Sequence, residues 1–191
     1  NKFTLSVVAS AAVLLAASLA LALAVGGVIS SLFVFLGAFT YGIVYTVWLK
    51  RRSAWNIVIG GLAGSFAVLA GSAAIDPSPQ AVPIILAVVL FLWTPPHFWS
   101  LAAAKSNDYA QAGVPMLPNT ASRQVWTLTV LLHIVALVAI SFVPLWYGQG
   151  LVYGLGAGIG GAYFLWAGLK LYLDPGKQTA MASFFASLIQ L

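Results

Sequence analysis

The chain has 191 residues, of which 62% are hydrophobic and 6% charged, and its mean hydropathy is +1.02. These values exclude a water-soluble globular domain and indicate an integral membrane protein in a lipid bilayer. The apolar runs are continuous and do not alternate, so the predicted fold is all-α, a polytopic transmembrane helix bundle and not a barrel. The net charge of +5 is better explained by the placement of basic residues at helix ends than by nucleic acid, and no nucleic-acid partner is expected.

Six apolar segments are long enough to cross a bilayer, which needs about 20 residues per helix. We predict spans at residues 5–25, 29–49, 56–75, 82–103, 124–144 and 149–173, with part of a seventh beginning near residue 178. The chain opens on Asn1 and stops inside an apolar run, so we expect residues 1–191 to be a single transmembrane domain truncated at both ends. Small residues four apart favour close helix packing, as in Gly60 and Gly64, Gly154 and Gly158, and Gly156 and Gly160.

The basic residues lie at alternate ends of these segments, namely Lys2, the cluster Lys50-Arg51-Arg52, Lys105, Arg123, Lys170 and Lys177. The turns between them, at residues 26–28, 76–81 and 145–148, contain no Lys or Arg. By the positive-inside rule the basic ends face the cytoplasm. We therefore expect a multi-pass protein of a bacterial or archaeal cell membrane, with the Lys/Arg-rich loops and Asp108 on the cytoplasmic side. Asp108 lies in the longest polar connection, roughly residues 104–123.

One apolar segment contains a cluster of unusual residues, Leu92-Trp93-Thr94-Pro95-Pro96-His97-Phe98-Trp99. His97 is ionisable and lies within a span, so it should face the bundle interior or a wet cavity. Its possible roles are haem-iron ligand, porphyrin contact, general base, or a neutral histidine bonded to a nearby backbone carbonyl. The proline pair removes two backbone donors and predicts a kinked helix that opens carbonyls to a cavity. Trp93 shares a helix face with His97, although Trp93 and Trp99 also suit an interfacial belt.

The segment Lys105-Ser106-Asn107-Asp108-Tyr109 follows directly. If helical geometry continues from His97, Asp108 lies on nearly the same face, about 16 Å further along. Asp108 and Asn107 are candidate oxygen ligands for Mg²⁺, which binds through one or two carboxylates while substrate phosphates complete its shell. Lys105 and Tyr109 would donate to the same phosphates. The plainer interpretation of the segment is a solvated helix end.

Two further features allow more than one interpretation. The cluster Lys50-Arg51-Arg52 is typical of a positive-inside anchor, yet Tyr41 and Tyr45 lie on one helix face just before it, and basic side chains at a cavity mouth suit a diphosphate. His133 stands alone among aliphatic residues and is interpreted as a hydrogen-bonded histidine of the bundle more readily than as a site.

These residues carry a resemblance to a known family. The segments Trp93-Thr94-Pro95-Pro96-His97-Phe98-Trp99, Asn107-Asp108-Tyr109 and Ala112-Gly113-Val114-Pro115-Met116-Leu117-Pro118 resemble the signature region of the protoheme IX farnesyltransferases (haem O synthases), a branch of the UbiA-type intramembrane prenyltransferases. Tyr45-Thr46-Val47-Trp48-Leu49-Lys50-Arg51-Arg52-Ser53, followed by Asn56-Ile57-Val58-Ile59-Gly60-Gly61, is similar to a second block of that family. The resemblance implies a bundle of nine helices around a central cavity, of which this chain covers the third to the start of the ninth.

The resemblance also implies an enzyme that transfers a farnesyl group from farnesyl diphosphate to a vinyl group of haem B, giving haem O for terminal oxidase biogenesis. It implies Mg²⁺ as cofactor, haem B as substrate, and haem A synthase or oxidase assembly proteins as further partners. The residues assigned to the site by position are, as catalytic groups, Asp108, Asn107 and Lys105; as metal ligands, Asp108 and Asn107; and as substrate contacts, Tyr45, Lys50, Arg51, Tyr109, Trp93, His97 and Trp99.

The chain departs from the family pattern in two places. The family's first aspartate-rich motif is absent, so we expect this chain alone to be inactive. Ala67-Val68 stands where a Pro-Pro pair is usual, and Gly71 is followed by Ser72 where Trp is common. Other classes stay open: another UbiA-type prenyltransferase, a non-catalytic haem-binding membrane subunit with His97 and His133 as axial ligands, and a small transporter built around a helix broken at its prolines.

Overall fold

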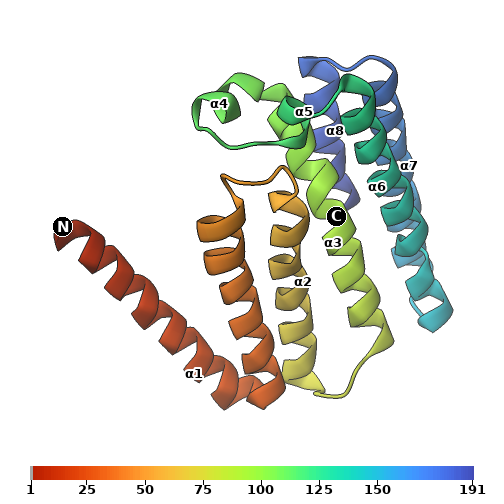
Figure 1. The fold of residues 1–191 in the computed structure, drawn as a ribbon. Helices are drawn as coiled ribbons and strands as arrows, with labels where there is room; N and C mark the ends of the chain where they lie inside the picture. The colour runs from red at the N-terminus through yellow and green to blue at the C-terminus, as the bar shows by residue number, and fades with distance from the viewer. Residues whose placement is uncertain (1) are drawn as a thin grey trace.

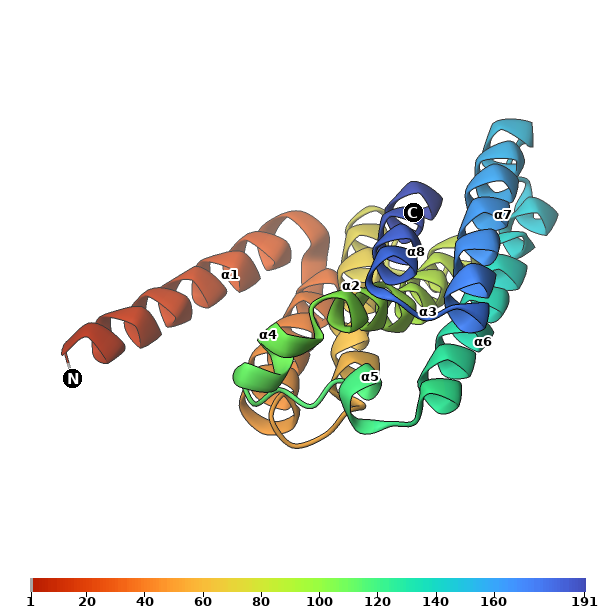
Figure 2. The same cartoon turned by 90° about the horizontal axis from the view of Figure 1, so that it is seen from above.

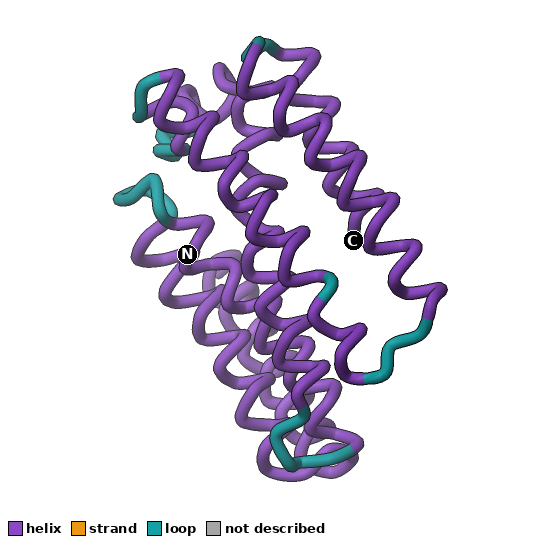
Figure 3. The backbone as a smooth tube through the Cα atoms, turned by 90° about the vertical axis from the view of Figure 1, so that its right-hand side faces the viewer, coloured by secondary structure: helices purple, strands orange, loops and turns teal. Residues whose placement is uncertain are grey.

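The computed structural model describes residues 2–191, with side chains from residue 6 onward, and shows a bundle of helices joined by short loops (Figure 3). No strand occurs among these described residues, so the all-α prediction is confirmed. The elements are α1 (Lys2–Phe39), the π-helix η1 (Thr40–Leu49), α2 (Asn56–Ile75), α3 (Ala81–Ala104), α4 (Ser106–Gln111), α5 (Leu117–Thr120), α6 (Arg123–Ser141), the 3₁₀-helix η2 (Val143–Tyr147), α7 (Leu151–Leu173) and α8 (Lys177–Gln190).

Five helical segments of the described chain are long and apolar enough to cross a membrane, at residues 6–49, 56–75, 81–104, 123–147 and 151–173. The first has 44 residues and contains two of the predicted spans. Its backbone leaves helical geometry at Gly27, with φ 74° and ψ −171°, a left-handed φ that favours glycine. Figure 1 shows the first arm of α1 running towards one end of the bundle and its second arm running back. Because only five separate segments are found, the predicted count of six full spans is not confirmed. The helix α8, of 14 residues, lies where part of a seventh span was predicted.

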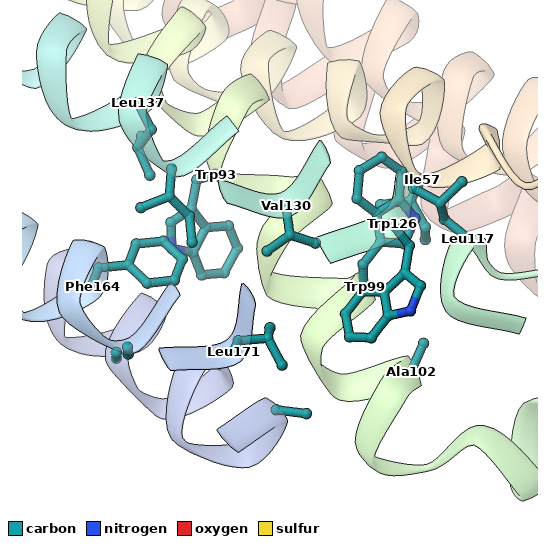
Figure 4. Packing of buried hydrophobic residues seen from close by; sticks show 14 of the residues in the cluster. Ile57, Trp93, Trp99, Ala102, Leu117, Trp126, Val130, Leu137, Phe164 and Leu171 are labelled. Atoms are coloured by element: carbon teal, nitrogen blue, oxygen red, sulfur yellow. The ribbon is translucent and has the colours of Figure 1, made fainter. Parts of the chain in front are cut away.

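The core surrounds α3, which packs against α2, α6 and α8. Figure 4 shows Trp99 beside Ile57, Leu117 and Trp126, and Trp93 beside Leu137 and Phe164. Trp99, Leu137 and Phe164 have no exposed surface. By contrast, the first arm of α1 stands away from the bundle in Figure 2, and its most apolar stretch is not buried at all. The arm therefore contributes little to the core.

The two ends of the bundle differ in charge. Figure 1 places loops 50–55, 105–122 and 174–176 at one end, and loops 76–80 and 148–150 at the other. The first end, called the basic end below, carries Lys50, Arg51, Arg52, Lys105, Arg123, Lys170 and Lys177. The predicted alternation of basic turns and turns without Lys or Arg therefore agrees with the topology, while the side chain of Lys2 lies outside the described residues.

The opposite end contains the tight connection expected at Asp76. Its Oδ1 accepts hydrogen bonds from the backbone N–H of Ser78 at 2.9 Å and from the Ser78 hydroxyl at 2.6 Å, and Gln80 Nε2 donates to Oδ2 at 2.7 Å. These bonds hold the pKa of the Asp76 carboxyl below its ordinary value. The carboxylate thus caps its own turn.

The helix α3 continues through Pro95 and Pro96 without the non-helical dihedrals found at Gly27. The break assumed in the transporter alternative is therefore absent, while a kink at the proline pair stays a prediction. The helix then ends at Ala104, because Lys105 leaves helical geometry at φ −116° and ψ 35° and α4 begins anew. The expectation that Asp108 continues the His97 face is therefore wrong.

The glycine pairs differ in how closely they pack. A Cβ at Gly60 would lie 2.8 Å from Cδ2 of Tyr45, and one at Gly160 would lie 2.9 Å from the backbone Cα of Gln190. Gly156 has nothing within 4 Å of the same position. Close packing is thus confirmed for α2 against η1 and for α7 against α8, but not at Gly156.

Candidate functional site

A cavity of about 150 Å³ opens near the basic end of the bundle, where Lys50 follows η1. We call it the tyrosine cavity; its lining comes from η1 with Lys50, from α2 and from α3, and consists of Tyr41, Tyr45, Lys50, Ile57, Gly60, Thr94 and Phe98. The rings of Tyr41 and Tyr45 lie 5.6 Å apart, and the Lys50 ammonium lies 5.9 Å from the Tyr45 ring centre. The cavity therefore joins an aromatic wall to a cation, at the outer limit of a cation–π contact.

The π-helix η1 was not predicted from the sequence. Its wider turns set the register of Tyr45 and Lys50, as the Lys50 N–H donates to the carbonyl of Tyr45 at 2.8 Å. Such π-turns occur often at functional sites. The closest approach of α2 to η1 depends on Gly60, which leaves room for the Tyr45 ring. Sequence reasoning named Gly60 for packing and Tyr45 for substrate, and the structure brings the two together.

Asn56 ties two loops of the basic end together. Its side chain is completely buried, and its Nδ2 donates to the carbonyls of Ser53 at 2.6 Å and of Pro115 at 3.1 Å. Its Oδ1 is buried without a hydrogen-bond partner. The first loop carries Lys50, and the second follows α4 with Asp108. Sequence reasoning gave Asn56 no role, although a polar residue at the start of an apolar span was a usable signal.

The helix α4 lies across the basic end (Figures 1 and 2). Asn107 and Asp108 are exposed on it, and Lys105 is exposed just before it. Tyr109 is half-buried against the core, near enough to Tyr45 for the two phenols to interact electrostatically. A tyrosine phenol is protonated at neutral pH, and burial raises the pKa of Tyr109 further, so the phenol can donate a hydrogen bond.

The acidic and amide groups of α4 fit a Mg²⁺ ion only as a partial ligand set. Among the described residues, no group of three or more His, Cys, Asp or Glu side chains could hold a metal ion. Asp108 offers one carboxylate and Asn107 one amide oxygen. This donor set fits the case in which substrate phosphates supply further ligands.

His97 faces α8, away from the lining of the tyrosine cavity. Its Nδ1 lies 2.7 Å from the hydroxyl of Ser187, and its ring stacks on Trp93 with 4.1 Å between centres. Phe184 covers another part of the ring at 4.6 Å. The sequence allowed His97 to be a neutral histidine bonded to a nearby backbone carbonyl. In the structure its Nδ1 instead meets the side-chain hydroxyl of Ser187 on another helix.

Trp99 and His133 pack against each other inside the bundle. Trp99 is fully buried, with its indole N–H unpartnered, and meets the ring of His133 edge-on at 5.5 Å. His133 Nδ1 lies 2.8 Å from the carbonyl of Thr129, which confirms the hydrogen-bonded interpretation. Because Trp93 and Trp99 are both buried, neither belongs to an interfacial belt. Arg51 is exposed on the turn after Lys50.

A larger cavity of about 500 Å³ lies between α2, α3, α6, α7 and α8, and no charged side chain lines it. Its polar groups are Ser141, Tyr153 and Gln190, of which Tyr153 donates to the carbonyl of Ser141 at 2.8 Å. A charged substrate group therefore finds complementary side chains at the tyrosine cavity and not here.

The fold is a bundle of helices long and apolar enough to cross a membrane, and the tyrosine cavity in it joins Lys50 to an aromatic wall. The sequence matches the UbiA prenyltransferase family over residues 4–189, and the chain belongs to that family. No solved structure matches it significantly.

Several similar proteins are named protoheme IX farnesyltransferase. The chain is 57% identical over 176 residues to protoheme IX farnesyltransferase 2 of Paramagnetospirillum magneticum, a match covering 92% of this chain and 61% of that protein. It is 49% identical over 185 residues to protoheme IX farnesyltransferase 1 of the same organism, covering 94% and 64%. It is 43% identical over 150 residues to protoheme IX farnesyltransferase of Rhizorhabdus wittichii, covering 76% and 50%. The chain thus spans less than two thirds of the length of these relatives.

Proposed function

We propose that the whole protein transfers a farnesyl group from farnesyl diphosphate to a vinyl group of haem B, giving haem O for terminal oxidases. In this proposal residues 1–191 belong to one transmembrane prenyltransferase domain, whose basic end faces the cytoplasm. The observation that carries it is the tyrosine cavity, where an aromatic pocket meets Lys50 beneath a helix that carries Asp108. The names of the relatives supply the substrates.

The charged end of the cavity suits a leaving diphosphate. Lys50 supplies a cation at the cavity wall, Arg51 follows on the same turn, and the phenol of Tyr109 stays protonated to donate a hydrogen bond. Groups of this kind stabilise negative charge that grows as the carbon–oxygen bond breaks. Asp108 and Asn107 would hold Mg²⁺, which when bound neutralises further diphosphate charge. Lys105 is placed beside them for the same anion.

The apolar end suits the farnesyl carbons. Phe98, Ile57 and the tyrosine rings exclude water from an allylic cation, and aromatic faces attract positive charge. The volume of about 150 Å³ is below the roughly 300–1,000 Å³ usual for ligand sites. The cavity therefore holds the reacting end of the chain, and the remaining isoprene units extend towards lipid.

The bond between C1 and oxygen breaks, and its electron pair leaves with the diphosphate. The electron pair of the haem vinyl group then forms a bond to C1, and water captures the resulting cation and loses a proton, which gives a hydroxyethyl group. We place the porphyrin on the side of α3 that carries His97 and Trp93, with Phe98 between this side and the tyrosine cavity.

The direct test uses membranes that contain the full-length protein, supplied with haem B, farnesyl diphosphate and Mg²⁺, followed by separation of the haems. Haem O is the expected product. Its absence, with the substrates and metal shown to be present, contradicts the proposal. A reversible bis-histidine haem spectrum without product would favour a haem-binding subunit instead.

The second test replaces the carboxylate of α4. Asp108→Ala should abolish haem O formation while the protein stays inserted, because the charged end loses its only carboxylate on α4. Asp174→Ala is the matched control, since Asp174 is also exposed at the basic end but follows α7. Full activity in Asp108→Ala would remove Asp108 from the mechanism. Co-purification with haem A synthase or oxidase assembly proteins would test the proposed protein partners.

A further inference from the structure

Ser187 of α8 makes two short hydrogen bonds that together fix a proton. Its Oγ lies 2.6 Å from the carbonyl oxygen of Phe184 and 2.7 Å from Nδ1 of His97. A carbonyl can only accept, so the single hydroxyl proton of Ser187 is donated to Phe184. Ser187 must then accept from His97, and the imidazole proton lies on Nδ1.

We propose that Ser187 is a positioning residue, which holds His97 as the Nδ1–H tautomer and leaves the lone pair of Nε2 free for the iron of the acceptor haem. The proposal rests on the proposed function for the identity of the acceptor. The positioning itself rests only on contacts within the chain.

The surroundings of His97 restrict its ring to this orientation. Trp93 stacks on it at 4.1 Å and Phe184 lies against it at 4.6 Å, while the Trp93 indole donates to the Ser187 carbonyl at 2.7 Å. Trp93 therefore links α3 to the same residue of α8 that holds the imidazole. His97 is only 8% exposed. A ring flip would lose the Ser187 bond inside an apolar site, where an unpaired polar group is costly.

The tautomer decides what His97 can bind. A neutral imidazole with its proton on Nδ1 presents only a lone pair at Nε2, and it cannot donate a hydrogen bond there. Histidines that bind metals usually donate the other ring N–H to an oxygen acceptor, which fixes the tautomer and raises ligand basicity. Ser187 supplies that acceptor here. The Nε2 atom of His97 has no hydrogen-bond partner within the described chain.

The same two helices provide a matched control. Ser183, one turn before Ser187, accepts a hydrogen bond from the Ser100 hydroxyl at 3.0 Å and is equally buried, but it makes no hydrogen bond to the imidazole. His133 provides an internal reference, because its Nδ1 faces the carbonyl of Thr129 and must also carry the proton. A change that affects His97 alone can therefore be separated from a general loosening of the bundle.

The first experiment measures the tautomer without haem. In full-length protein labelled with ¹⁵N-histidine and embedded in membranes, NMR should show His97 protonated on Nδ1. Ser187→Ala should add a population protonated on Nε2, while Ser183→Ala and the signal of His133 should not change. A proton on Nε2 in the wild type, or the same tautomer in Ser187→Ala, would overturn the proposal.

The second experiment measures binding. Ser187→Ala should weaken the affinity for haem about 10- to 100-fold and raise KM for haem B, with KM for farnesyl diphosphate unchanged. Ser183→Ala should stay within about two-fold of the wild type in both values. An unchanged haem Kd in Ser187→Ala, or equal loss for both substrates, would refute the positioning role.

Two further variants keep the proposal testable if Ser187→Ala folds poorly. Thr and Val have nearly the same shape, so Ser187→Thr should keep haem affinity and Ser187→Val should lose it. Equal affinities in this pair would contradict the role of the hydroxyl. Wild-type protein that shows the Nδ1–H tautomer but forms no haem O would defeat the proposed function and leave the tautomer assignment standing.

Discussion

Asn56 connects two loops by donating hydrogen bonds, and the direction of these bonds decides how its substitution should affect stability. Its amide N–H groups donate to the carbonyls of Ser53 and Pro115 from a fully buried position. Asn56→Ala removes both bonds, each worth about 0.5–1.5 kcal/mol net. It also removes the buried, unpartnered Oδ1, which relieves about 1–3 kcal/mol of desolvation cost. The two terms nearly cancel, so the global stability of Asn56→Ala should change by less than about 2 kcal/mol.

Asn56→Asp has the same shape and the opposite consequence. An ionised carboxylate cannot donate, and it would face two carbonyl oxygens from a buried position. Burying an unpaired charge costs several kcal/mol, more than losing a neutral bond. The Asp variant should therefore be less stable than the Ala variant by about 3 kcal/mol or more, and its apparent Tm in detergent should be the lowest of the three proteins.

The two loops joined by Asn56 should become more accessible to protease even in a variant whose global stability is unchanged. Both variants release the segment after α4 from the turn after η1, so trypsin should cleave faster at Lys105 than in the wild type. Ser65→Ala is the control, because it removes a buried bond of α2 to the carbonyl of Ala87 at 2.8 Å far from these loops. Cleavage at the wild-type rate in Asn56→Ala, or an Asp variant as stable as the Ala variant, would refute this reasoning.

Two other predictions concern glycines. Gly160→Ala should lower the apparent Tm, because its Cβ would meet the backbone of α8 at Gln190. Gly156→Ala has open space around it and should leave the apparent Tm unchanged or raise it. Equal effects of the two substitutions on the apparent Tm would contradict the assigned contacts. Gly60→Ala should raise KM for farnesyl diphosphate and leave KM for haem B unchanged, because its Cβ would displace the Tyr45 ring. Steady-state kinetics with each substrate varied in turn measure the two values, and an equal rise in both would contradict the prediction.

Much of the helical architecture could be predicted because lipid solvation imposes a simple rule on sequence. A helix in hydrocarbon must be long, apolar and internally hydrogen-bonded, and the predicted spans at 56–75 and 82–103 match α2 and α3 to within one residue. The reversal at Gly27 was also predicted as a turn between spans. That it joins two arms without a loop could not be foreseen, since glycine is common within membrane helices.

The short helices at the basic end could not be predicted from local sequence. With six and four residues, α4 and α5 are too short to be stable by propensity alone. They are held by contacts such as the Ser106 hydroxyl donating to Asn119 Oδ1 at 2.9 Å and Asn119 Nδ2 donating to the Ser106 carbonyl at 3.0 Å. These partners lie 13 residues apart, beyond the range of any helical periodicity.

In the candidate site, too, contacts between sequence neighbours could be predicted and contacts between distant segments could not. Tyr45 and Lys50 are near neighbours in sequence, so their joint placement at a helix end followed from spacing. The partner of His97 is Ser187, 90 residues later, and no local pattern connects the two. Sequence reasoning could therefore name His97 but not the face of α3 on which its hydrogen bond is made.

The residues of α3 that matter for the proposed reaction lie on two sides of the helix. Thr94 and Phe98 line the tyrosine cavity, whereas His97 turns to α8, so one helix separates the proposed donor site from the proposed acceptor residue. Phe98 belongs to both sides, since it lines the cavity and meets the His97 ring edge-on at 5.0 Å between centres. In the proposed arrangement, with the allylic carbon in the cavity and the porphyrin beside His97, the Phe98 ring lies between the two substrates. The side chain at position 98 should then control the approach of the vinyl group to C1 more directly than any charged residue of the basic end.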